Sequence, residues 1–138
     1  MRLRVHGVWP FESRHLHHFG SSVRSQGFDW MMEEVRGVDP GVASVDDCFF
    51  VLAAAVLAST ALGRPTPDVG SWHEDLVAEH EWEPSSAEAA HLAELVGGIA
   101  QGSSLRKGFE ALEGLEPGIT EEWVEAMASL RQRLLESG

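Results

Sequence analysis

Lysine and cysteine are scarce in this chain of 138 residues, which holds a single lysine, Lys107, and a single cysteine, Cys48. One cysteine excludes a disulfide framework within the chain and fits a reducing cytoplasm. Nine arginines accompany the one lysine, and with the abundant alanine, glycine and valine this bias is typical of high-GC bacterial coding sequences. The opening residues lack the charged and then apolar pattern of a secretory signal, so we expect a cytoplasmic protein.

Complete catalytic signatures are also missing from the sequence. The stretch from Gly97 to Gly102 has glycines like those of a phosphate-binding loop, but it lacks the lysine and the preceding strand. No Gly-x-Ser-x-Gly elbow occurs. His73 and Glu74 open like a zinc-protease motif, but Val77 occupies the place of its second histidine. These absences weigh against an enzyme, and no cofactor is predicted.

The longest apolar segment, from about Val45 to Leu62, predicts a central helix. It is apolar on every side, so it must also be buried on every side. Asp46 and Asp47 stand at its start, where the helix dipole favours carboxylates, while Gly63 and Pro65 end it. Its apolar part is shorter than the roughly 20 residues that span a bilayer. We therefore expect this helix to be the centre of a folded domain and not a membrane anchor.

Caps and helical periodicity predict further helices around this one. Capping boxes begin at Ser71 and Ser85, and Thr120 is the expected N-cap of the last helix. The expected helices span about 28–36, 45–62, 71–80, 85–99, 104–113 and 120–134. The pair Gly97-Gly98 weakens its helix by about 1 kcal/mol per glycine, which the close approach of a neighbouring backbone would explain.

The sequence thus predicts one all-α domain over residues 1–138, a compact bundle of five or six helices around residues 45–62. Residues 1–27 are expected to be irregular and rich in histidine. Within them, Leu3 and Val5 alternate with polar residues, which indicates a short extended segment. A single such segment cannot form a stable sheet, so it does not change the fold class.

The chain is strongly and unevenly acidic, with a formal net charge of −12. Residues 1–36 hold five arginines and four acids, whereas residues 37–138 hold five basic and eighteen acidic residues. The acidic part repels nucleic-acid phosphate and anionic membranes, so we expect neither as a partner. A basic protein is the partner that this charge favours, although a high net charge also simply keeps proteins soluble.

The candidate contact surface for such a partner is the segment 74–83. It concentrates five acids and one aromatic residue in ten positions: Glu74, Asp75, Glu79, Glu81, Glu83 and Trp82. An aromatic ring among carboxylates is a good docking point for an arginine or lysine side chain. We expect Trp82 to be partly exposed, whereas Trp30, Trp72 and Trp123 occupy helix starts or apolar faces and are expected in the core.

The histidines His15, His17 and His18, near His6 and Glu12, form the only other polar cluster with metal-binding chemistry. Imidazole and carboxylate groups are typical ligands of zinc, nickel and copper. This spacing matches no recognised metal motif, and we predict no metal site here, because three histidines in four residues rarely face one ion. Cys48 lies among acids and apolar residues that raise a thiol pKa, so we interpret it as structural.

Several short segments along most of the chain match, in the same order, the sequence pattern of a known family. The segments are Gly7-Val8-Trp9-Pro10-Phe11-Glu12-Ser13, Asp29-Trp30, Leu52 to Pro65, Ser104-Leu105-Arg106 with Phe109, and Trp123 to Leu134. Together they resemble a bacterial family of small helical proteins classed only as a domain of unknown function, family four-two-five-nine. The segment from Arg14 to Gln26 interrupts that family's opening pattern. The resemblance implies a mostly helical fold and no established activity.

Three function hypotheses follow from these patterns. The leading one is a non-enzymatic binding module for a basic protein, of which an immunity or antitoxin-like inhibitor is one concrete form. The second is a metal-dependent enzyme that uses the histidine segment. The third is a structural module of a larger assembly with no ligand of its own.

Overall fold

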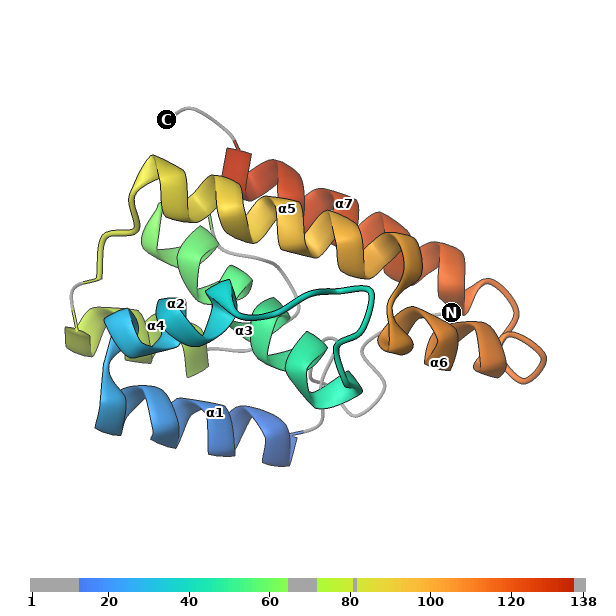
Figure 1. The fold of residues 1–138 in the computed structure, drawn as a ribbon, viewed down its shortest axis with the longest axis horizontal. Coiled ribbons are helices and arrows are strands. Elements are labelled where there is room, and N and C mark those ends of the chain that lie inside the picture. Colours follow the sequence, from blue (N-terminus) through green and yellow to red (C-terminus); the bar gives the residue numbers. More distant parts are fainter. Residues whose placement is uncertain (1–12, 65–71, 81, 136–138) are drawn as a thin grey trace.

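The computed structural model describes residues 13–64, 72–80 and 82–135, and this part of the chain is a bundle of helices (Figure 1). The helices are α1 (Ser13–Gln26), α2 (Phe28–Arg36), α3 (Val45–Ala61), α4 (Trp72–His80), α5 (Ser86–Gly102), α6 (Ser104–Leu112) and α7 (Ile119–Leu135). The predicted all-α class is confirmed, and the described residues form seven helices where five or six were expected. The extended segment predicted around Leu3 and Val5 lies outside the described residues.

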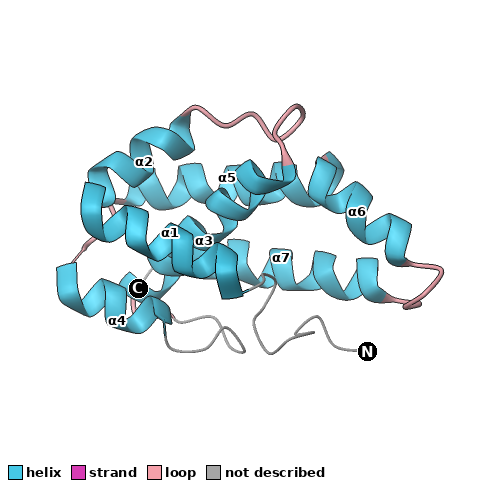
Figure 2. Cartoon of the chain, turned by 90° about the horizontal axis from the view of Figure 1, so that it is seen from below, coloured by secondary structure: helices cyan, strands magenta, loops and turns pink. Residues whose placement is uncertain are grey.

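Helix α3 lies at the centre and contacts each of the other six helices described. The pair α5 and α7 runs along one side of it and α1 along the opposite side (Figure 1). Helices α2 and α4 flank it in the perpendicular view (Figure 2). Every residue from 51 to 59 is buried, as expected for a helix that is apolar on all faces. No helix in the described part of the chain combines the length and apolarity that crossing a bilayer demands.

Local signals fix both ends of α3 as the sequence predicts. The hydroxyl of Ser44 accepts a hydrogen bond from the Asp47 amide at the N-terminus. At the C-terminus, Gly63 adopts a left-handed conformation with φ of 82°. The amides of Gly63 and Arg64 then donate to the carbonyls of Thr60 and Ser59, which is the Schellman arrangement. The chain therefore leaves the central helix in a defined direction.

Helix α1 corrects the expectation that residues 1–27 are irregular, because residues 13–26 are helical. Phe19 and Val23, one turn apart, are both buried in the core. The ring of Phe19 meets that of Phe50 edge-on, with 5.1 Å between ring centroids. Serine, histidine and glycine are poor helix formers, so this helix depends on its packing more than on local propensity. Such a sparse apolar pattern gave no clear helical signal.

Two arginines bind carbonyl groups at the C-terminal ends of other helices. Arg64 donates from Nε to the Arg133 carbonyl in the last turn of α7, at 2.7 Å. Arg106 donates from Nη1 to the Ala100 carbonyl near the end of α5, at 2.6 Å. These carbonyls lack amide partners within their own helices, and the helix dipole favours a cation beside them. The two arginines therefore hold the ends of α5 and α7 in place.

The start of α7 is capped by Glu113 and not by Thr120, which corrects the expected N-cap. The Glu113 carboxylate accepts hydrogen bonds from the Gly118 amide at 2.6 Å and the Thr120 amide at 3.1 Å. These bonds, with that from Gly118 as the larger cause, hold the pKa of Glu113 below its ordinary value. The side chain of Thr120 adds a smaller contribution that lowers the pKa of Glu113 in the same direction. A carboxylate from the end of α6 thus ties together the loop that leads into α7.

Replacing Leu52 with aspartate should unfold the protein. The side chain is fully buried in α3, and an unpaired charge there costs several kcal/mol, a large share of the 5–15 kcal/mol that stabilises a typical domain. Leu115→Asp is the matched control, because Leu115 is 82% exposed. Circular dichroism and urea denaturation should show a folded control and a non-cooperative Leu52 variant. A cooperatively folded Leu52→Asp protein would contradict the central position of α3.

Replacing Glu113 with glutamine should make the fold less dependent on pH. The folded-state pKa is lowered, so the carboxylate stabilises the fold above its unfolded-state pKa, and this contribution disappears as the pH falls through the folded-state value. At neutral pH the Glu113→Gln variant should have the lower melting temperature, and the gap to the wild type should close on acidification. Glu125→Gln, an exposed change in the middle of α7, should show no such closing gap in thermal unfolding.

Candidate functional site

The predicted acidic segment forms an exposed surface at the end of the bundle that holds α4. Glu74, Asp75 and Glu79 are exposed on α4, and Glu83 is exposed on the connection to α5. We call these four carboxylates, together with Trp82, the acidic surface. They are close in sequence, and each of the four carboxylates is exposed. Glu81, the remaining predicted contact residue, lies outside the described residues.

Trp82 is partly exposed, as predicted, but its ring is also part of the fold. It stacks on Phe28 of α2, with ring centroids 4.6 Å apart and an angle of 10° between the rings. Phe28 is buried, so this contact fastens the α4–α5 connection to α2. Trp82 therefore presents a fixed aromatic surface, and removing its ring would also disturb packing. Among the tryptophans expected in the core, Trp123 is fully buried and Trp30 is half-buried; the Trp72 side chain lies outside the described part.

Glu79 on this surface already holds a guanidinium group from the same chain. Arg24 of α1 donates from Nε at 3.2 Å and from Nη2 at 3.1 Å, and both bonds end on Oε2 of Glu79. The two side chains are 51% and 52% exposed. An exposed pair of this kind contributes about 0–1 kcal/mol to stability. Sequence patterns could not reveal this contact, because the two residues are far apart in the chain.

The histidine segment lies in α1 and not in an irregular loop. The backbone places His15, His17 and His18 in the first half of that helix, and their side chains fall outside the described part. Among the side chains that the structure does describe, no group of three or more His, Cys, Asp or Glu residues could hold a metal ion. Cys48 is fully buried, and burial, as the largest cause, raises the pKa of its thiol. Such a thiol is a poor nucleophile.

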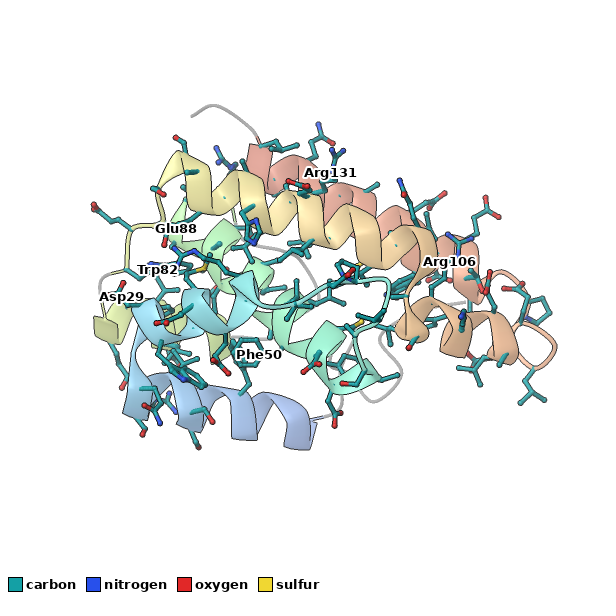
Figure 3. The ribbon with its side chains drawn as sticks, viewed as in Figure 1. Asp29, Phe50, Trp82, Glu88, Arg106 and Arg131 are labelled. Carbon is teal, nitrogen blue, oxygen red and sulfur yellow. The ribbon has the colours of Figure 1, made fainter. Side chains whose placement is uncertain are left out.

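The structure also contains a groove over the paired glycines of α5, which was not predicted from the sequence. We call it the glycine groove: Gly97 and Gly98 form its floor, the turn Asp39-Pro40-Gly41 one wall, and α7 around Arg131 the other. Its volume is about 720 Å³, which falls within the range of roughly 300–1,000 Å³ that is usual for ligand pockets. In Figure 3, Arg131 and Trp82 lie far apart, so the groove is separate from the acidic surface.

The glycine pair allows two distant side chains to approach the backbone of α5. A Cβ atom at Gly97 would lie 3.4 Å from Nε of Arg131, and one at Gly98 would lie 3.0 Å from Cγ of Pro40. The close approach is thus made by side chains from the α2–α3 turn and from α7, and not by a neighbouring backbone as the sequence predicts. The only sequence signal for the groove was the unusual pair of glycines inside a helix, because its walls come from positions far away in the chain.

No family model matches this chain, and no curated protein or solved structure matches it either. The resemblance to family four-two-five-nine therefore stays a prediction. The residues that carry it have structural roles here: Arg64 and Arg106 hold helix ends, and Phe109 stacks on Trp123 at 4.8 Å between ring centroids. In these three residues the resemblance therefore reflects packing and helix ends, and it points to no activity.

Alanine at the two glycine positions should have different effects on stability. Gly97→Ala removes a helix-weakening residue, and the flexible end of Arg131 can move aside, so we expect a gain of about 1 kcal/mol. At Gly98 the new Cβ would press on the ring of Pro40, whose turn is closed by a bond from the Gly41 amide to the Asp39 carboxylate. Gly98→Ala should therefore gain less or destabilise the fold. Urea denaturation that shows equal gains for both would contradict this geometry.

Proposed function

We propose that this protein is a non-enzymatic binding module that captures a basic protein partner on its acidic surface. The observation that carries the proposal is the pair between Arg24 and Glu79, in which this surface already binds a guanidinium group at hydrogen-bond distance. A partner's arginine or lysine can take the place of Arg24, since an exposed ion pair contributes at most about 1 kcal/mol.

The charge around the surface supports the same proposal. Glu74, Asp75 and Glu83 are exposed beside the pair, and the whole chain carries a formal net charge of −12. Opposite charge on a partner speeds diffusional encounter and suppresses acidic competitors. Trp82 adds a fixed ring on which a cationic side chain can stack. Its contact with Phe28 means that little rotational freedom is lost on binding.

An immunity or antitoxin-like inhibitor is the concrete form that we favour. A protein that acts on nucleic acid needs a basic surface for phosphate groups, and a small acidic protein can cover such a surface by matching its charge. This form requires only binding and no reactive thiol. Cys48 is buried and its thiol pKa is raised, so it is a poor nucleophile.

The test is capture of a partner by the immobilised protein, followed by affinity measurement against that purified partner at several salt concentrations. Glu74→Lys with Glu83→Lys should abolish capture. Glu121→Lys with Glu125→Lys changes the net charge equally at exposed positions of α7 and should leave capture unchanged. Affinity should fall as salt rises, because charges beyond about 8 Å are screened at physiological ionic strength. Equal loss in both double variants, or no salt dependence, would contradict the proposal.

A sharper prediction concerns Arg24, which occupies part of the proposed surface. Arg24→Gln should tighten binding of the partner severalfold, because it releases Glu79 for the incoming cation. Arg36→Gln is the matched control: Arg36 is also exposed and pairs with a carboxylate, that of Glu88 at 3.8 Å, and its removal changes the net charge by the same amount at another place. Surface plasmon resonance that shows the same effect for both variants would indicate a general charge effect and contradict a role for Glu79.

A further inference from the structure

We infer that the glycine groove is a self-association surface on which a second copy of this chain docks around a two-fold axis. The inference is independent of the proposed function, since it concerns another face and another partner. It depends on three features of the described residues: the open backbone of α5, an exposed apolar side chain beside it, and charges of both signs on the walls.

The first feature is the floor of the groove. Gly97 and Gly98 are half-buried: Arg131 and Pro40 of the same chain lie close to the places where their side chains would stand, and the part of the α5 backbone that stays exposed between them lines the groove. Val124 and Ala128 of α7 line the groove beside it. Helices α5 and α7 pack antiparallel (Figure 1), and the groove follows this pair. A protruding side chain of a second molecule can thus reach the backbone closely and leave apolar surface buried on both sides.

The second feature is Val42, which directly follows the turn that walls the groove and is 83% exposed. The backbone that carries this side chain is held in a hydrogen-bonded turn. The amides of Val42 and Ala43 donate to the Asp39 carbonyl at 3.1 and 2.9 Å, and the Asp39 side chain accepts from the Gly41 amide. An exposed apolar side chain on this turn, next to the groove, gives the same face a projection and a recess.

The third feature is the presence of both acidic and basic side chains in the groove, which favours a second copy of this chain over a ligand of one charge. Asp39 and Glu94 line the groove together with Arg131. A cationic ligand would meet Arg131, and an anionic ligand would meet two carboxylates, so neither fits well. A two-fold interface must be self-complementary, because every contact between two residues occurs twice. Setting Glu94 of one copy against Arg131 of the other pairs opposite charges twice, which this surface allows and a ligand of one sign does not.

The net charge of the chain opposes this association, so the strength of the dimer should depend on salt concentration in a characteristic way. Two copies with a formal charge of −12 each repel one another at long range, and salt screens this repulsion beyond about 8 Å at physiological ionic strength. Self-association should therefore strengthen as salt rises from low concentration. Binding of a basic partner should weaken over the same range, so the two interactions can be told apart on one protein sample.

The test is sedimentation velocity over a wide range of protein concentration, at low and at physiological salt. The wild type should form a dimer at high concentration. Glu94→Arg and Arg131→Glu alone should each weaken the dimer by about tenfold or more, because each sets like charges opposite one another. Both positions are exposed, so the variants should stay folded. The double variant with both changes should recover the dimer, since the charges are then exchanged and complementary again.

Two further variants separate the groove from other surfaces. Val42→Asp should weaken the dimer, whereas Leu115→Asp, at a position equally exposed at 82% but outside the groove, should not. Glu74→Lys on the acidic surface should leave the dimer intact, so failure of the proposed function would not imply failure here. A wild type that stays monomeric at every concentration, or a dimer that Glu94→Arg leaves unchanged, would overturn the inference. So would a folded double variant that does not recover the dimer.

Discussion

Complete burial of α3 is the constraint on which the rest of this structure depends. A helix that is apolar all round has no face for water, so it is stable only when other helices cover every side. The other helices meet this demand with single apolar stripes, such as Trp123, Met127, Leu130 and Leu134 of α7. Their outward faces are free to carry the excess of acids, which is why a strong negative charge and a well-packed core occur in one small domain.

The helices around α3 also have to be fixed at their ends, where backbone groups lack partners. Arg64 and Arg106 satisfy carbonyls of α7 and α5, while Ser103 joins α5 to α6 by donating to the Ile99 carbonyl and accepting from the Arg106 amide. The bonds of Arg106 and Ser103 link the end of α5 to the start of α6, and the bond of Arg64 links the end of α3 to the end of α7. Arg64 and Arg106 belong to the segments that resemble the family, and in this structure they join helices to one another.

The sequence predicts features that depend on residues a few positions apart and misses those that depend on distant ones. The central helix, its stop at Gly63 and the capping box of Ser85 with Glu88 were predicted and are confirmed. Helix α1 was missed because its support comes from a contact between Phe19 and Phe50. The pair of Arg24 with Glu79 and the walls of the glycine groove also join separate helices. The acidic surface was thus predicted from the sequence, whereas its pair with Arg24 and the walls of the glycine groove became visible only in three dimensions.

The two glycines of α5 differ in a way that bears on why the groove exists. At Gly98 a Cβ atom would lie 3.0 Å from Cγ of Pro40, so the proline ring would have to shift, and packing there favours glycine. At Gly97 a Cβ atom would only touch the flexible side chain of Arg131, and alanine would strengthen the helix by about 1 kcal/mol. Packing therefore does not explain Gly97. Glycine at this position lowers the stability of α5, and the contact with a second copy proposed for the glycine groove would account for that cost.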